Sequence, residues 1–128
     1  MKKIWYSKTV HTSFDETVDN LNIALKQQEF WILTQIDIKA KLKEKLDKEI
    51  DAYTIFWACN PSLAYRALQG EYEIWLLLPC NIIVYEKHWE VVVSAIVPSV
   101  AMNMVDDDTV KQVAREAEEK LTNVIDSL

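Results

Sequence analysis

The sequence contains a single glycine, Gly70, and only three prolines among its 128 residues. Because glycine and proline dominate sharp turns and flexible connections, their scarcity argues against a linker or a low-complexity tract. Half of the residues are apolar, and a chain of this length can bury a core without disulfide bonds. We therefore expect one domain over residues 1–128.

The sequence also has fewer basic than acidic residues. Fourteen lysines and arginines face 20 acidic residues, so the formal net charge is −6. Nucleic-acid binders present a basic face and anionic membranes attract basic segments, so we expect neither partner. The apolar stretch at residues 74–85 is too short to cross a bilayer. Because Lys8 interrupts the apolar residues that follow the N-terminal lysines, we expect no secretory signal and a cytoplasmic protein.

Cysteine is scarce too, with Cys59 and Cys80 as its two occurrences and no Cys-x-x-Cys motif. In the cytoplasm these residues are expected to be reduced thiols. A zinc site made of both thiols with His11 and His88 is an alternative, but structural zinc ligands usually come in close pairs. We therefore predict no metal site, and the sequence leaves any cofactor unknown.

Hydrophobic periodicity predicts strands alternating with helices. The strands are expected at residues 4–10, 31–38, 53–59, 74–78, 81–86 and 90–97. The helices are expected after Ser13, over residues 38–50, after Asn60, and after Asp107 or Asp108. Ser13 and Glu16 have capping-box spacing, and Pro61 suits the first turn that follows an asparagine cap. This order predicts an α+β fold with a mostly antiparallel sheet of about six strands and long helices on one face.

Both faces of the predicted sheet are apolar. In strand 53–59 one face carries Tyr53, Ile55, Trp57 and Cys59, and the other carries Thr54, Phe56 and Ala58. Two long helices cover about one face, and soluble monomers seldom leave a large apolar patch exposed. The second face therefore needs a second subunit, the lysine-rich helix 38–50 or an apolar ligand. We expect a homodimer, because isologous pairing is the commonest solution.

Two Cys-Asn dipeptides, in Cys59-Asn60-Pro61 and Pro79-Cys80-Asn81, flank the short helix after Asn60. A thiol just before a helix start is favoured as thiolate, so we expect a lowered pKa at Cys59. The candidate ligand-binding residues are Cys59, Asn60, Arg66, Cys80 and Asn81. The alternative is structural: buried cysteines often only pack, and asparagine is a good helix cap. No residue is predicted to be catalytic.

The segments around these dipeptides carry a family resemblance. Residues 58–64 (ACNPSLA) and 76–86 (LLLPCNIIVYE), with 34–40 and 42–46 before them, resemble the domain of unknown function 302 family over nearly the whole chain. The resemblance implies a curved antiparallel sheet like that of the TATA-binding protein, with its long helices on one face. It also implies a small protein that tends to dimerise, and it implies no activity.

Several functional hypotheses remain open from the sequence. The first is a homodimeric domain that binds a small ligand at the sheet and the dimer seam. The alternative is a thiol-dependent enzyme or sulfur carrier that uses Cys59 with Cys80. The third hypothesis is haem or metal binding, and the fourth is a purely structural interaction protein. The sequence therefore leaves open whether the chain is an enzyme.

Overall fold

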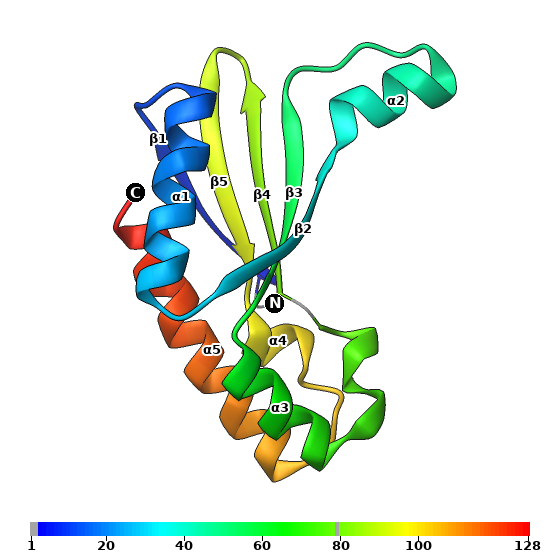
Figure 1. The fold of residues 1–128 in the computed structure, drawn as a ribbon, viewed down its shortest axis with the longest axis vertical. Helices are drawn as coiled ribbons and strands as arrows, with labels where there is room; N and C mark the ends of the chain where they lie inside the picture. The colour runs from blue at the N-terminus through cyan, green and yellow to red at the C-terminus, as the bar shows by residue number, and fades with distance from the viewer. Residues whose placement is uncertain (1–2, 79) are drawn as a thin grey trace.

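The computed structural model describes residues 3–78 and 80–128, which form an α+β fold around one open antiparallel sheet (Figure 1). The sheet has the strand order β1-β5-β4-β3-β2. Its strands are β1 (Trp5–Val10), β2 (Trp31–Asp37), β3 (Tyr53–Cys59), β4 (Cys80–Lys87) and β5 (Glu90–Ile96). The helices are α1 (Phe14–Gln27), α2 (Ile38–Leu46), α3 (Pro61–Gly70), α4 (Pro98–Ala101), α5 (Asp108–Asp126) and the 3-10 helix η1 (Tyr72–Leu76). The predicted fold class is confirmed.

The sheet has five strands among the described residues, not about six, because the predicted strand 74–78 falls largely within η1. The Glu71 side chain accepts a hydrogen bond from the Glu73 amide (2.9 Å), and the Ile74 amide donates to the Glu71 carbonyl (3.1 Å). These local bonds close a helical turn, and Ile74 is buried beside α3 and α5. Trp75, which falls in the strand predicted at residues 74–78, therefore lies in η1. Helix α4 was also not predicted.

The helix caps follow the prediction closely. Ser13 Oγ accepts from the Glu16 amide (3.1 Å), Asn60 Oδ1 from the Leu63 amide (3.2 Å), and Asp107 Oδ1 from the Val110 amide (2.9 Å). Each bond satisfies an amide that lacks a partner within its own helix. Asp107, rather than Asp108, is the cap of α5.

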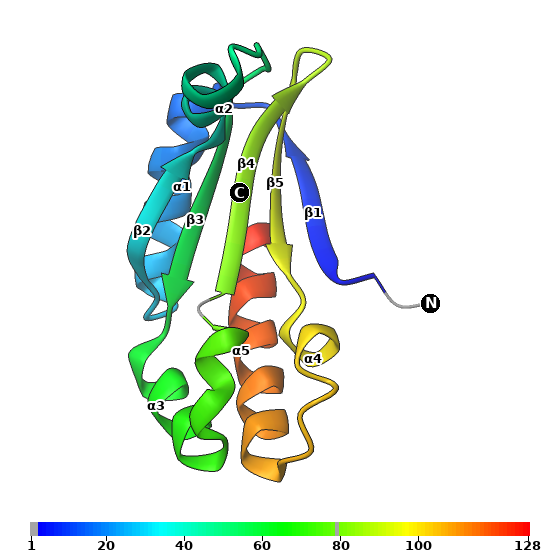
Figure 2. The same ribbon diagram turned by 90° about the vertical axis from the view of Figure 1, so that its right-hand side faces the viewer.

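Helices α1 and α5 pack on the same face of the sheet (Figures 1 and 2). Leu21 and Leu25 of α1 meet the C-terminal half of α5 and the sheet in one hydrophobic core. The N-terminal half of α5 packs with α3, η1 and Met102 in a second core. Because α5 contributes to both cores, it fixes α3 and η1 against the end of the sheet.

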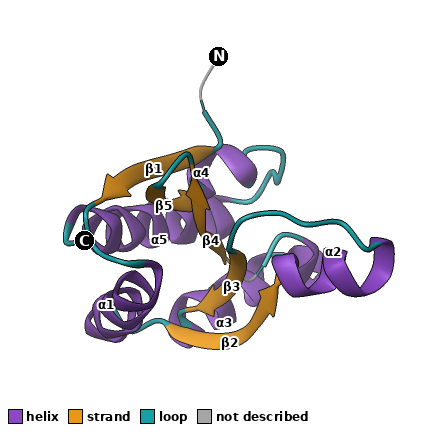
Figure 3. Cartoon of the chain, turned by 90° about the horizontal axis from the view of Figure 1, so that it is seen from above, coloured by secondary structure: helices purple, strands orange, loops and turns teal. Residues whose placement is uncertain are grey.

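The opposite face of the sheet is largely uncovered by the helices of the described chain (Figure 2). Helix α2 lies on the opposite side of the sheet from α1 and α5 and projects beyond its end (Figures 1 and 3). It has no buried residue, and Leu46 on it is 63% exposed. The lysine-rich helix therefore leaves most of the second face open.

Candidate functional site

The open face of the sheet is lined largely by apolar side chains from all five strands. Strand register places Ile55 opposite Ile83, Tyr53 opposite Tyr85, and Trp57 opposite Asn81. The same alternation adds Trp5, Val92 and Ile96 from β1 and β5, and Trp31 and Ile36 from β2. Trp5, Trp31 and Trp57 are 51%, 61% and 39% exposed. The prediction of a sheet with two apolar faces is therefore confirmed.

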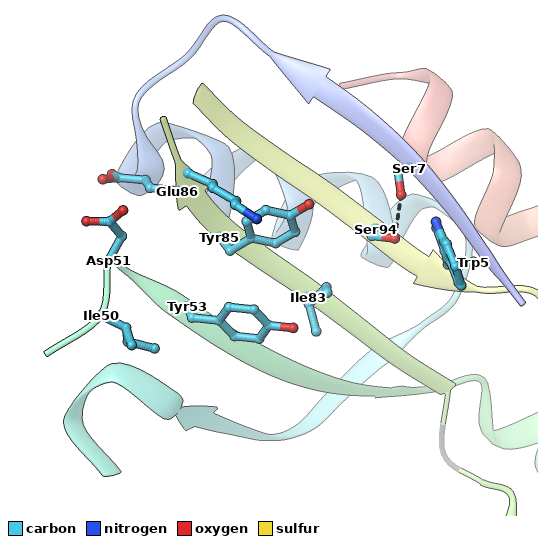
Figure 4. A pocket seen from close by; sticks show the side chains of 10 residues that line it. Trp5, Ser7, Ile50, Asp51, Tyr53, Ile83, Tyr85, Glu86 and Ser94 are labelled. Carbon is cyan, nitrogen blue, oxygen red and sulfur yellow. Dashed lines mark hydrogen bonds between the residues drawn. The ribbon is translucent and has the colours of Figure 1, made fainter. Parts of the chain in front are cut away.

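Part of this face is hollowed to a volume of about 640 Å³ (Figure 4). The lining residues come from β1, β3, β4 and β5 and from the segment before β3: Trp5, Ser7, Ile50, Asp51, Tyr53, Ile83, Tyr85, Glu86, Lys87 and Ser94. This volume lies within the range of small-molecule pockets, which combine an apolar lining with a few polar groups. The open face thus contains a hollow of the right size and composition for a small ligand.

Two aromatic side chains form the centre of the hollow. The rings of Tyr53 and Tyr85 stack across β3 and β4, with centroids 5.5 Å apart and planes 14° apart. Such cross-strand aromatic pairs stabilise a sheet by about 0.2–1 kcal/mol. Trp5 stands on the far side of the Ser7–Ser94 pair, whose hydroxyls share a hydrogen bond of 2.7 Å (Figure 4). The strands therefore hold the aromatic rings in place before any ligand binds.

The charged groups of the hollow gather at the end where β3 begins. The Glu86 amide donates to the Ala52 carbonyl (2.9 Å), which brings Glu86 beside Asp51. Figure 4 shows both carboxylates at this end, beyond the two tyrosines. Lys87 also lines the hollow. Within residues 3–78 and 80–128, none of these three side chains forms an ion pair, so their charges remain available to a ligand.

The two thiols lie at the other end of the sheet, in the interior. Cys59 and Cys80 are buried and line a cavity of about 20 Å³ with Phe30, Leu63 and Met102. Burial, with a smaller contribution from the charge of Cys59, raises the pKa of Cys80 to about 12. Burial also raises the pKa of Cys59. The expected lowering of the Cys59 pKa is therefore wrong, because desolvation of the thiolate outweighs the dipole of α3.

The other predicted binding residues lie apart from one another. Asn60 is buried, and besides capping α3 it donates through Nδ2 to the Gln28 carbonyl (3.4 Å). Arg66 Nη1 and Nη2 donate to Glu116 Oε1 (3.1 Å) and Oε2 (2.6 Å), an ion pair between α3 and α5. Asn81 is exposed on the open face. The structure therefore places Cys59, Asn60 and Cys80 around one small cavity and separates Arg66 and Asn81 from them.

The zinc ligands considered from the sequence are split between the two ends of the sheet. His88 lies in the turn between β4 and β5, whereas Cys80 begins β4 at the opposite end. Among the described residues, no group of three or more histidine, cysteine, aspartate or glutamate side chains is placed to hold a metal ion. In the same part of the chain, no helix is both long and apolar enough to cross a membrane.

Comparison with known proteins identifies the family. Residues 6–128 match the family described as "Domain of unknown function DUF302". The chain belongs to the DUF302 family. A DUF302 structure, the crystal structure of an uncharacterized conserved protein from Bacillus stearothermophilus, matches with a TM-score of 0.92 and 29% identity over 98% of both chains. A comparison with curated proteins gives no match. The resemblance seen in the sequence is confirmed, and the DUF302 description assigns no activity.

The residues of the hollow were not singled out as a site from the sequence. Tyr53 was placed on an apolar face, but its pairing with Tyr85 depends on the β3–β4 register, which a single sequence does not reveal. Asp51 and Glu86 lie at the same end of the hollow only because the segment before β3 bonds to the end of β4. The apolar character of both sheet faces was the sequence signal that pointed to the open face of the sheet.

Proposed function

We propose that this protein is a homodimeric domain that binds a small ligand in the hollow on the open face of its sheet. The observation that carries the proposal is the hollow itself, which has aromatic walls and charged groups at one end. Unpartnered apolar surface of this extent is uncommon on soluble monomers and is typical of binding surfaces. The ligand covers the hollow, and a second copy of the chain covers the rest of the face.

The support for a second copy comes from the groups around the hollow. Helix α2 buries no residue of its own subunit, and a nine-residue helix is marginal without packing. Trp89, at the tip of the β4–β5 turn, is fully exposed. Residues 38–50 carry five lysines and three acidic residues, while the whole chain is acidic, with a net charge of −6. A basic arm on an acidic body is complementary to another copy of itself.

Asn81 shares the open face with the hollow and is retained as a ligand contact at the edge of that face. Ligand binding by Cys59, Asn60, Arg66 and Cys80 remains a prediction, and the lining of the hollow lends it no support. These four residues would have to serve a different site at the α3 end of the sheet.

Ligand binding is tested by thermal unfolding in the presence of a panel of metabolites. A ligand of the hollow raises the melting temperature of the wild-type protein, because binding to the folded state alone stabilises it. The Tyr85→Ala variant loses this shift. Tyr65→Ala is the matched control, since Tyr65 is 63% exposed on α3, outside the hollow. A panel without any shift, or equal shifts in Tyr85→Ala and wild type, contradicts the proposal.

Dimerisation is tested by sedimentation velocity at micromolar concentration. The wild type sediments as a dimer, and Trp57→Glu sediments as a monomer because it places a charge on the apolar open face. Ile23→Glu is the matched control: Ile23 is also an exposed apolar residue, but it lies on α1, which packs on the other face. A monomeric wild type would rule out the dimer, and a dimer disrupted by Ile23→Glu alone would place the interface elsewhere.

The alternative function, a thiol-dependent enzyme or sulfur carrier that uses Cys59 with Cys80, has one supporting observation. The two thiols line the same small cavity. The raised pKa of both thiols disfavours the thiolate that such chemistry requires. Rapid iodoacetamide labelling of native Cys59 near neutral pH would favour the thiol-dependent function. Labelling only after unfolding would mean that the thiol is a buried packing residue.

A further inference from the structure

The charged groups and aromatic rings of the hollow favour a ligand with a positive charge. Asp51 and Glu86 oppose the single basic side chain, Lys87, and none of the three forms an ion pair within the described ranges. The net charge of −6 adds a negative field over the whole molecule, which attracts cations and repels anions. A neutral apolar ligand would desolvate the two carboxylates without compensating them.

The aromatic walls act in the same direction. The face of an aromatic ring attracts cations through its quadrupole. The Lys3 ammonium already lies 6.0 Å from the centroid of the Trp5 ring, so one ring of this wall faces a cation of the chain itself. The stacked Tyr53 and Tyr85 rings extend from the acidic end toward Ser94 (Figure 4). A ligand can therefore place its positive charge near the carboxylates and lay its apolar body along the rings.

We propose that the hollow binds organic cations that carry an aromatic or apolar body, such as quaternary ammonium or phosphonium compounds. The juxtaposition of two unpaired carboxylates with the Tyr53–Tyr85 stack carries the proposal. It rests on the proposed ligand-binding function and adds the chemical class of the ligand. The Ser7 and Ser94 hydroxyls, between Trp5 and the tyrosines, share one hydrogen bond, and Ile83 gives the middle of the hollow an apolar surface.

The experiment compares two probes of the same shape and opposite charge by isothermal titration calorimetry. Tetraphenylphosphonium chloride and sodium tetraphenylborate are each titrated into the full-length protein in a sodium buffer of low ionic strength, where screening is weak. We expect tetraphenylphosphonium to bind at least about tenfold more tightly than tetraphenylborate, because the carboxylates and the ring faces attract the charge at its centre and repel that of the borate.

Variants locate the preference. Asp51→Asn combined with Glu86→Gln removes both carboxylates, and we expect an approximately tenfold loss of tetraphenylphosphonium affinity. Asp19→Asn combined with Glu119→Gln is the matched control. It removes the same charge from exposed positions on α1 and α5, away from the hollow, and we expect a change of less than about twofold there.

The outcomes separate this inference from the proposed function. Equal binding of both probes that Tyr85→Ala abolishes would leave the ligand-binding function intact and overturn the preference for cations. Tighter binding of tetraphenylborate, or an equal loss of affinity in both double variants, would also overturn it. Absence of binding by either probe at millimolar concentration would overturn the inference, and the metabolite panel would then decide the function separately.

Discussion

We expect that raising the pH lowers the stability of the folded protein through Cys80. The pKa of this thiol is about 12 in the folded chain, against an ordinary value of 9.0. Below pH 9 the Cys80 thiol keeps its proton in both the folded and the unfolded chain, so it contributes no pH dependence to the free energy of unfolding. Above pH 9 the unfolded chain loses the proton and the folded chain keeps it. The free energy of unfolding therefore falls as the pH rises from 9 toward about 12.

The magnitude follows from the separation of the two pKa values. Each pH unit above the unfolded value costs about 1.4 kcal/mol, so the loss between about pH 8 and about pH 10.5 is about 2 kcal/mol. Cys80→Ala lacks the titrating group, and its own packing defect is the same at every pH. The stability difference between wild type and Cys80→Ala therefore shrinks by about 2 kcal/mol over this range.

Urea unfolding of both proteins at matched concentration measures this difference. Lysine and tyrosine titration affects both proteins equally, so it cancels in the comparison. If the two stabilities change in parallel with pH, the thiol ionises as easily in the folded chain as in the unfolded one. That result would refute the burial of Cys80, and it would revive the thiol-dependent alternative.

Three further predictions concern the framework around the site. Gly70→Ala lowers the free energy of unfolding, measured in urea, by about 1–3 kcal/mol, because the Cβ of the new alanine would overlap Asp107 Oδ1, which caps α5. Unchanged stability would mean that the Asp107 side chain moves aside at no cost. In the monomeric Trp57→Glu background, Trp89→Gly raises the free energy of unfolding by about 1 kcal/mol, since Trp89 has a φ of 67°; a loss of stability in this background would mean that the indole packs within its own subunit. Arg66→Gln leaves the urea midpoint nearly unchanged, because Arg66 and Glu116 are 34% and 40% exposed; a large drop would show that this ion pair holds α3 to α5.

The sequence predicted the elements whose signals are local. Ser13, Asn60 and Asp107 begin helices where their side chains can cap free amides. The strands predicted at residues 81–86 and 90–97 also leave a short turn between them, although His88 and Trp89 in that turn both adopt positive φ, where Asn-Gly is the usual pair. The failure at residues 74–78 has a physical reason: a short apolar run fits a buried strand or a buried helical turn equally well.

The candidate site depended on contacts that no local pattern encodes. The two Cys-Asn dipeptides suggested one binding site for the residues beside the helix after Asn60. Cys59 and Cys80 do line one cavity, but that cavity is too small and too apolar to activate a thiol. The hollow arises from the register between β3 and β4 and from the return of the chain at Ala52. Alternation of side chains indicated that two faces were apolar, but not where the open face would be concave.

Mapping a fragment library onto the protein by amide chemical shifts in ¹⁵N-labelled samples tests whether the open face of the sheet is the ligand site. We expect that fragments which bind shift the amides of Ile83, Tyr85 and Ser94 on the open face. Amides on the outer sides of α1 and α5 remain unchanged. Fragments that shift only the residues around Cys59, or no fragment that binds at all, would contradict the claim that the open face is the ligand site.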